Sequence, residues 1–584
     1  MPWTAMQVSL DDRHVWSGRL LGIASFCGVF ALITLVWEIG WPVDKSLLQL
    51  IRGITWCMVI VAALAEIGLM LLVNKRQHLL RGLLLLVMPL FAFFQMCLGD
   101  TLWPILDAIF PKKSVRYIAM GVVQLTLILP LVVRTIRKVR DQSWFNRLPP
   151  ALIGLLSFAL AILLGTCLLM TPNATDGGIN WIDALFTSTS AVCVTGLSTL
   201  NVETQFTVTG QAIILVLIQI GGLGVMTLTY FLALIAGQGI NLRDRVALRD
   251  LLSEDNLGQV GNFVWHIVGA TLLIELAGIL LLHHYWQDTH IRSSQLWWDC
   301  VFHGISAFCN AGFSTYGDGL MHASVKDNHE VHSVIMVLIV LGGFGFALFT
   351  ELSRYVTGQI RRKWTGEMRA LPRLSVHCRL ATVTTGFLLL FGTLGFAISG
   401  NGWWEALFNS VSCRTAGFNI TNFAGHGAAA LVVACVLMAV GGNPGGTAGG
   451  IKTTTFAIIL LEAKRLLLGQ RDLVMWDRRA SRDAVERSFV TLILCVMWIS
   501  VASVCLGIGN PLAAAGDVIF EVISAFGTVG LTRGLTSQLS DFSKMVIILT
   551  MFAGRIGILT FAMTLSGTHK PSIVRLPEAR VPLG

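Results

Sequence analysis

Four short segments of this chain repeat one arrangement of residues that could bind a cation. Each segment predicts a short helix with an acidic residue in its first turn, where a carboxylate favours the positive end of the helix dipole. The segment ends, 12 or 13 residues after the acidic residue, at a glycine within a turn of small residues. The acidic residues are Asp183, Asp299, Glu405 and Asp517, and the glycines are Gly196, Gly312, Gly417 and Gly530. Glycine adopts positive φ without steric cost, so the carbonyl oxygens of such turns can point at one axis. Because rings of carbonyls replace the hydration shell of a cation, the pattern predicts a filter.

The predicted filter comprises three residues from each turn. They are Val194, Thr195, Gly196, Asn310, Ala311, Gly312, Thr415, Ala416, Gly417, Thr528, Val529 and Gly530. The alternative is four unrelated loops, because helices commonly end at a glycine. Successive glycines are 116, 105 and 113 residues apart, and each has a phenylalanine nine or ten residues before it. A spacing this regular indicates an internal repeat rather than four independent helix ends.

A second motif, GGNPGGTAGGIKTTTF at 441–456, interrupts an apolar segment that would otherwise continue from about 427 to 466. It is not a nucleotide-binding P-loop, because Ile451 separates Gly450 from Lys452 and no strand precedes it. A helix break inside a membrane must be buried in protein or line a cavity. The candidate gate residues in it are Gly441, Gly442, Gly445, Gly446, Gly449, Gly450 and Lys452. A plain helix kink remains the alternative interpretation.

Arg555 lies about midway along an apolar segment, where an arginine is costly and therefore functional by default. The alternative is a structural ion pair with a buried carboxylate, of which Glu521 is the nearest in sequence. Arg414 and Arg533 flank the third and fourth turns, and we expect them to tie the turns down; the alternative is placement on the protein surface.

The composition indicates which elements position these residues. The chain has 584 residues, of which 54% are hydrophobic and only 13% charged, and its mean hydropathy is +0.72. About a dozen apolar stretches are long enough to cross a bilayer, which takes roughly 20 residues each. Soluble enzymes, nucleic-acid binders, disordered proteins and secreted disulfide scaffolds are excluded. The 12 cysteines form no metal or disulfide pattern. The net charge of +9 reflects basic residues in the loops between apolar segments. Since basic loops lie mostly on the cytoplasmic side, their positions predict that both termini are cytoplasmic.

The fold class predicted is an all-α integral membrane protein with four membrane–pore-loop–membrane repeats in a pseudo-fourfold arrangement. An N-terminal extension, 1–147, contains four extra spans at about 17–41, 54–73, 79–98 and 117–133. The repeats span 148–240, 241–360, 361–470 and 471–567, the third contains the loop 441–450, and a cytoplasmic tail occupies 568–584.

These motifs resemble the TrkH/KtrB/HKT superfamily of potassium transporters over about residues 150–567. The resemblance implies that the 441–450 loop obstructs the pore below the filter and that Arg555 acts there as an electrostatic barrier to cations. It also implies a homodimer and a separate cytoplasmic nucleotide-binding regulatory ring of the RCK type. In that family, serine in place of the first-repeat glycine, here Gly196, accompanies Na⁺ transport.

We therefore expect a non-enzymatic potassium uptake subunit in the cell membrane of a bacterium, surrounded by lipid. K⁺ is the transported ion, bound at the filter residues, and no cofactor, transition-metal site or nucleic-acid partner is expected. The main alternative is a twelve-helix secondary transporter made of two six-helix halves. An integral-membrane enzyme would need clustered His, Asp or Glu residues within its spans, and none is evident in the sequence.

Overall fold

The computed structural model describes the N-terminal helices, four later helical groups and a few isolated positions. The described residues are 10–42, 44–73, 128, 131, 135, 150–224, 260–291, 295–365 and 374–566. The segments expected to span the membrane at 79–98 and 117–133, and the tail 568–584, lie outside these residues apart from 128 and 131. Within them the fold is almost entirely helical, with one antiparallel hairpin, β1 (Val474–Met475) and β2 (Arg478–Arg479).

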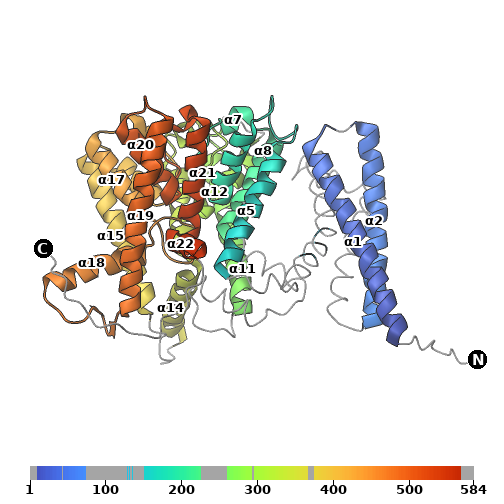
Figure 1. Ribbon diagram of the computed structural model, residues 1–584, viewed down its shortest axis with the longest axis horizontal. Helices are drawn as coiled ribbons and strands as arrows, with labels where there is room; N and C mark the ends of the chain where they lie inside the picture. Colours follow the sequence, from blue (N-terminus) through green and yellow to red (C-terminus); the bar gives the residue numbers. More distant parts are fainter. Residues whose placement is uncertain are drawn as a thin grey trace, which may run out of the picture.

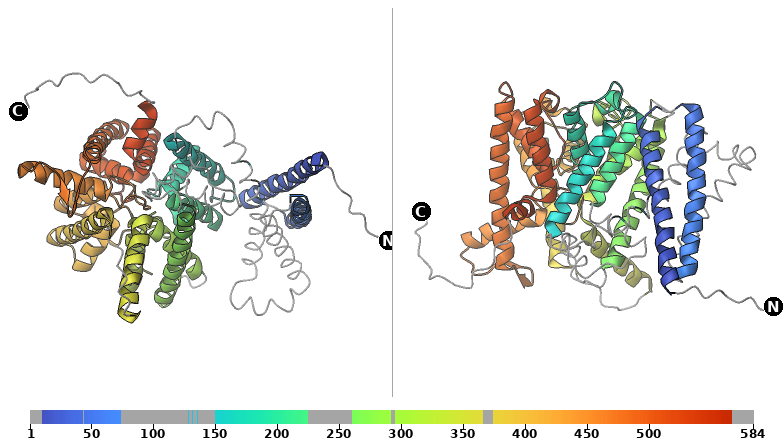
Figure 2. Two further views of the ribbon diagram at one scale, coloured as in Figure 1. Left: turned by 90° about the horizontal axis from the view of Figure 1, so that it is seen from below. Right: turned by 45° about the vertical axis from the view of Figure 1, so that its right-hand side comes forward.

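The first two helices, α1 (Leu10–Gly40) and α2 (Lys45–Val73), form a hairpin that lies to one side of the other helices (Figures 1 and 2). Both begin before the apolar segments predicted at 17 and 54. Hydropathy marks only the apolar part of a helix, and polar turns continue these two helices beyond it. The hairpin meets the rest of the protein where the Gly40 carbonyl accepts a hydrogen bond from the Asn173 amide at 3.0 Å.

The remaining helices repeat one order: a long helix, a short helix, an extended turn and another apolar helix. The groups are α5 (Pro150–Leu169), α6 (Trp181–Val192) and α8 (Val208–Leu223); α11 (Val260–Trp286), α12 (Leu296–Cys309) and α13 (His329–Gly343); α15 (Val376–Ile398), α16 (Trp403–Ser412) and α17 (Ala428–Ala439); and α19 (Arg482–Gly509), α20 (Ala515–Gly527) and α21 (Asp541–Ile556). Seen from below, they lie around a common centre (Figure 2). Among the described helices, α1, α5, α11, α15 and α19 are each long and apolar enough to cross a bilayer.

In the second, third and fourth groups, the last of the three helices is followed by a further helical segment. These segments are α14 (Phe346–Thr365), α18 (Thr453–Leu467) and α22 (Ile558–Ser566). The axes of α13 and α14 differ by 107°. Short pieces follow the turns, namely α7 (Val202–Gln205), η4 (Gly319–Met321), η5 (Phe423–Gly425) and η6 (Thr536–Gln538).

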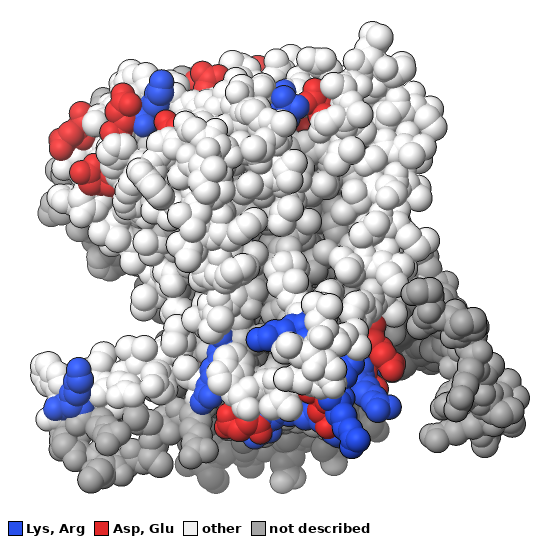
Figure 3. All heavy atoms as spheres, turned by 90° about the vertical axis from the view of Figure 1, so that its left-hand side faces the viewer, with Lys and Arg blue, Asp and Glu red and all other residues white. Residues whose placement is uncertain are grey.

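On the face drawn in Figure 3, charged side chains gather at the two ends of the molecule and leave a broad uncharged band between them. The end that carries α18 includes a basic group of exposed side chains. Lys464, Arg471, Arg478, Arg479 and Arg482 belong to it. A band without charges between two polar ends is what a bilayer requires of a protein that crosses it.

The four short helices α6, α12, α16 and α20 have the predicted form. They are 10 to 14 residues long, and each carries its acidic residue in the first turn, where a carboxylate favours the positive end of the helix dipole. Their phenylalanines are at most 1% exposed and anchor each helix in the core; these are Phe186, Phe302, Phe408 and Phe520.

Candidate functional site

The twelve predicted filter residues lie in four turns of closely similar backbone geometry. In each turn two residues have positive φ, and one residue separates them. The φ values are 58° and 88° at Val194 and Gly196, 61° and 67° at Asn310 and Gly312, 72° and 78° at Thr415 and Gly417, and 52° and 93° at Thr528 and Gly530. Positive φ is uncommon for residues other than glycine, and such outliers cluster at functional sites.

The four turns contact one another in a closed order. A Cβ atom added at Gly196 would collide with the Ala311 carbonyl oxygen and lie 3.1 Å from the Gly312 Cα. One added at Gly312 would lie 2.7 Å from the Ala416 oxygen. At Gly417 it would meet the Val529 oxygen, and at Gly530 the Thr195 oxygen, which returns to the first turn. The glycines are therefore required by space as well as by φ, and each turn presents a carbonyl to its neighbour.

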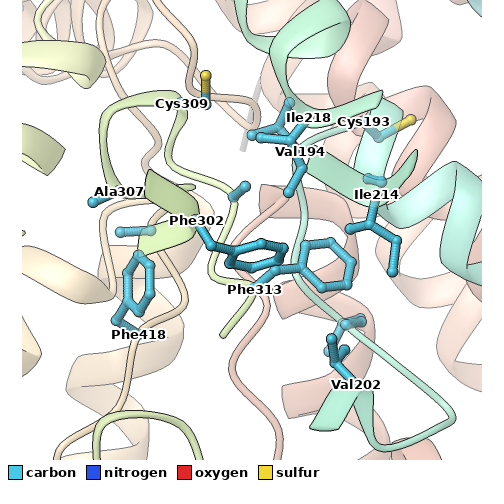
Figure 4. Close-up of a cluster of buried hydrophobic side chains, with 14 of the residues drawn as sticks. Cys193, Val194, Val202, Ile214, Ile218, Phe302, Ala307, Cys309, Phe313 and Phe418 are labelled. Atoms are coloured by element: carbon cyan, nitrogen blue, oxygen red, sulfur yellow. The ribbon is translucent and has the colours of Figure 1, made fainter. Parts of the chain in front are cut away.

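Large buried side chains flank the four turns. The residue after each glycine is a large apolar one, at most 2% exposed; these are Leu197, Phe313, Phe418 and Leu531. Figure 4 shows Phe313 and Phe418 with Val194 and Phe302 in one cluster of buried side chains. Buried, close-packed side chains have little freedom, so they help to hold the turns in place.

The acidic residues of the short helices also fasten the chain that leaves each turn. In three groups the carboxylate accepts from the residue 16 positions later; the pairs are Asp183 with Thr199 (2.7 Å), Asp299 with Thr315 (2.7 Å), and Asp517 with Arg533 as an ion pair. The third group differs, because Thr421, 16 residues after Glu405, is hydrogen-bonded to Asn409 at 3.1 Å instead. From the sequence, only a role at the helix dipole was predicted for these acids; this second role was missed, although the constant spacing of 16 could have indicated it.

Polar contacts also link neighbouring groups on the side of the turns from which the chain leaves. Glu203 accepts from the Gly317 amide at 2.8 Å. Arg533 donates to the Ala424 carbonyl at 3.4 Å, and the Lys544 ammonium lies 2.8 Å from the Asp183 carboxylate. The last contact joins the fourth group to the first.

The second turn has the most elaborate support. The Asp299 carboxylate contacts His290 Nε2 at 2.9 Å and accepts from the Tyr316 hydroxyl at 3.1 Å. His303 contacts the Ser314 hydroxyl at 2.9 Å through its Nε2. All of these side chains are buried, so the network fixes the chain just beyond Gly312.

The glycine-rich break between α17 and α18 forms a closed loop. The Gly441 amide donates to the Ile451 carbonyl at 2.9 Å, and the Ile451 amide donates to the Ala439 carbonyl at 3.2 Å. The loop is also joined to the end of α13, because the Asn443 amide donates to the Gly343 carbonyl at 3.1 Å. These backbone hydrogen bonds satisfy groups that the broken helix would otherwise leave unpaired.

This loop lies directly against two of the four turns. A Cβ atom at Gly449 would collide with the Thr528 side chain, and one at Gly441 would lie 3.3 Å from Thr415 Cγ2. Arg414 joins the third turn to the loop, since its Nη2 donates to the Gly441 carbonyl at 3.0 Å. Lys452 donates to the Ala448 carbonyl within the loop at 2.6 Å.

Arg555, near the end of α21, donates to the Thr447 carbonyl of this loop and, at 2.5 Å, to the Gly221 carbonyl of α8. Glu521, considered above as an ion-pair partner, instead accepts from the hydroxyls of Thr532 and Thr536. In the part of the chain that the structure describes, no carboxylate lies within ion-pair distance of Arg555. Its charge is therefore placed at the junction of α8, α21 and the loop.

Three further helix ends at glycines were not predicted from the sequence. The helices α8, α13 and α21 each end at a GxxG pattern whose last glycine has positive φ; these are Gly224 (80°), Gly345 (91°) and Gly557 (92°). The first glycine of each pattern packs against a carbonyl at the end of the adjacent short helix, where a Cβ atom would collide; the pairs are Gly221 with Val192, Gly342 with Phe308, and Gly554 with Phe526. The spaced glycines were a readable signal, but each break is too short to interrupt the hydropathy pattern.

Comparison with known proteins identifies related sequences and folds. The model of the TrkH family, described as "Cation transport protein", matches residues 153–573. The chain is 35% identical to the Ktr system potassium uptake protein B of Bacillus subtilis, over 76% of this chain and 99% of that protein. It is also 35% identical to the potassium/sodium uptake protein NtpJ of Enterococcus hirae, over 77% and 100%.

A similar fold is found in the crystal structure of the potassium transporter TrkH from Vibrio parahaemolyticus. The TM-score is 0.55 at 18% sequence identity, and the match covers 82% of this chain and 96% of that one. At this identity the similarity concerns the fold alone.

Proposed function

The chain belongs to the TrkH family of cation transport proteins, and from that premise we propose that it carries K⁺ into the cell through a pore whose filter is the four turns around Gly196, Gly312, Gly417 and Gly530. The observation that carries the proposal is the closed order of contacts, in which each glycine abuts the carbonyl of the next turn. One relative is named a potassium uptake protein and another a potassium/sodium uptake protein, which supports K⁺ as a transported ion.

In this proposal the chain consists of four membrane–pore-loop–membrane repeats in a pseudo-fourfold arrangement, at 148–240, 241–360, 361–470 and 471–567. The four helical groups support this division, since each has a short helix between two longer ones. The hairpin of α1 and α2 belongs to an N-terminal extension, 1–147. Both termini face the cytoplasm, as the basic loops require.

The proposed path begins at the turns. Carbonyl oxygens replace the hydration shell of K⁺, and the carboxyl ends of the short helices α6, α12, α16 and α20 add negative potential there. Beyond the turns, the loop 441–450 obstructs the path and Arg555 raises the energy of a passing cation. Support for this gate comes from the contacts of the loop with Thr415 and Thr528, and from the hydrogen bond between Arg555 and Thr447.

The proposed assembly is a homodimer with a separate cytoplasmic RCK-type regulatory subunit. The name of the B. subtilis relative, a component of a Ktr system, supports a multi-subunit transporter. The exposed basic residues at the end that carries α18 offer charge for such a contact.

Uptake in a bacterial host that lacks its own K⁺ uptake systems tests the proposal. We expect the chain to restore growth at low external K⁺ and to promote Rb⁺ uptake that excess K⁺ suppresses. A twelve-helix transporter for another solute would do neither. A protein that reaches the membrane in folded form but supports no K⁺ or Rb⁺ uptake would refute the proposal.

A further inference from the structure

Glu275 is a carboxyl group in the middle of the membrane-spanning helix α11 that the mechanism above does not use. Its side chain is buried, with 3% of the residue exposed. Ionisable residues inside the membrane are costly and generally have a specific function. None of the basic side chains in the described ranges lies within ion-pair distance of it, so it is not half of a structural salt bridge there.

The partners of Glu275 are instead neutral and come from two other elements. Gln219 of α8 donates its Nε2 to both carboxyl oxygens, at 3.0 and 3.2 Å. The Cys309 thiol, at the end of α12, lies 3.8 Å from Glu275 Oε1 and 3.7 Å from Gln219 Oε1. Glu275 thus holds together α8 of the first group and α11 and α12 of the second.

Cys309 gives this contact its importance, because the next residue, Asn310, starts the second filter turn. Cys309 is 1% exposed, and Asn310 has φ of 61°. Because the Glu275 carboxyl and the Gln219 amide hold the Cys309 thiol, they fix the end of α12 and the position of Asn310. Displacing Cys309 would move the carbonyls of the second turn.

The last turn of α8 links the same cluster to the gate. Gly222 packs against Cys309, so that a Cβ atom there would collide with the thiol. The neighbouring Gly221 accepts the hydrogen bond of Arg555 at 2.5 Å and packs against Val192, next to the first filter turn. This end of α8 therefore contacts Glu275 and Arg555, the first filter turn through Val194, and the residue that precedes the second turn.

We propose that Glu275 is a positioning residue for ion selectivity: through Gln219 and Cys309 it sets the second filter turn against the last turn of α8. The inference rests on the proposed filter, since it concerns how one of its four turns is placed. It assigns a role to hydrogen bonding by Glu275 rather than to its charge.

The test compares Glu275→Ala with Glu275→Gln in the full-length protein, by Rb⁺ and Na⁺ uptake into membrane vesicles normalised to folded protein. Losing one buried hydrogen-bonding group should lower the Rb⁺/Na⁺ uptake ratio about fivefold in Glu275→Ala. Glu275→Gln should keep the wild-type ratio, because its amide oxygen still accepts from Gln219.

Gln211→Ala is the matched control. Gln211 is a buried polar residue that also joins α8 to α12, accepting from Trp298 Nε1 at 2.8 Å. Its other hydrogen bonds go to the carbonyls of Val202 and Phe206, which are not next to a filter turn. Gln211→Ala should lower thermal stability and leave the Rb⁺/Na⁺ uptake ratio unchanged. Should Glu275→Ala fail to fold, Cys309→Ala tests the same link from the filter side and should lower the ratio in the same direction.

A folded Glu275→Ala protein with the wild-type ratio would overturn the inference, and so would an equal loss in Glu275→Gln, which would assign the effect to charge. These outcomes differ from a failure of the proposed function. In that case the wild-type protein itself would show no preference for Rb⁺ over Na⁺.

Discussion

Replacing Arg555 with alanine should raise the maximal rate of K⁺ uptake, provided that the filter is intact. The guanidinium donates to two backbone carbonyls, of Thr447 and Gly221. Neither acceptor carries a formal charge, and the described part of the chain offers it no carboxylate within ion-pair distance. In the proposed path, the positive charge of Arg555 would therefore act on a passing cation without a neutralising partner.

Electrostatics gives the scale of this effect. Two unit charges about 4 Å apart at an effective dielectric constant near 20 interact by roughly 4 kcal/mol. Water in the pore reduces that figure considerably. If only about 1.4 kcal/mol remains on the limiting barrier, its removal raises the rate about tenfold. The variant also loses a tie between the loop and α8, which favours opening further.

The assay is initial Rb⁺ uptake per folded protein for the wild type, Arg555→Ala and Arg555→Lys. We expect a rise of up to about tenfold for alanine and a rate near wild type for lysine, which keeps the charge. Arg533→Ala removes a cation from the opposite side of the turns, where it pairs with Asp517, and should not raise uptake. A destabilised Arg555→Ala protein with unchanged or reduced normalised uptake would refute the reasoning and make Arg555 a structural residue.

Three other outcomes follow from the geometry. Shortening the 441–450 loop should raise cation flux and weaken any dependence on a regulator; a folded, dimeric variant that transports more slowly than wild type would show that the loop is not a gate. Gly342→Ala should lower the thermal unfolding temperature in detergent, because its Cβ would collide with the Phe308 carbonyl and overpacking costs about 1–3 kcal/mol; an unchanged temperature would contradict this. Thr315→Val removes the hydroxyl that donates a hydrogen bond to Asp299. It should cost about 1 kcal/mol of stability and lower the K⁺/Na⁺ uptake ratio. A protein in which neither quantity changes would exclude an anchoring role for Thr315.

The sequence was sufficient to predict the short helices, their acidic first turns and the break after α17. These features are local: an acidic residue near a helix start, a glycine in a turn, and six glycines in ten residues leave few alternatives to the backbone. The membrane class followed from composition, and the family model and the relatives confirm the resemblance to TrkH/KtrB proteins.

What could not be predicted depends on contacts between distant parts of the chain. Arg555 bonds to carbonyls 108 and 334 residues away, and Gln219 meets Glu275 across 56 residues. No local pattern determines which carbonyl an arginine reaches. The breaks at Gly224, Gly345 and Gly557 were hidden for another reason, because one glycine pair within an apolar run barely changes its hydropathy.

The ratio of K⁺ to Na⁺ uptake in glycine-to-serine variants of the turns tests the central claim most directly. In Gly196→Ser the new Cβ would collide with the Ala311 carbonyl, and the residue would be strained at φ of 88°. Gly177→Ser is the matched control, since Gly177 has φ of 87° but nothing within 4 Å of an added Cβ. The account predicts that Gly196→Ser, and likewise Gly312→Ser and Gly530→Ser, lose discrimination between K⁺ and Na⁺ while Gly177→Ser keeps it. Unchanged selectivity in the well-folded turn variants would contradict the assignment of these turns as the filter.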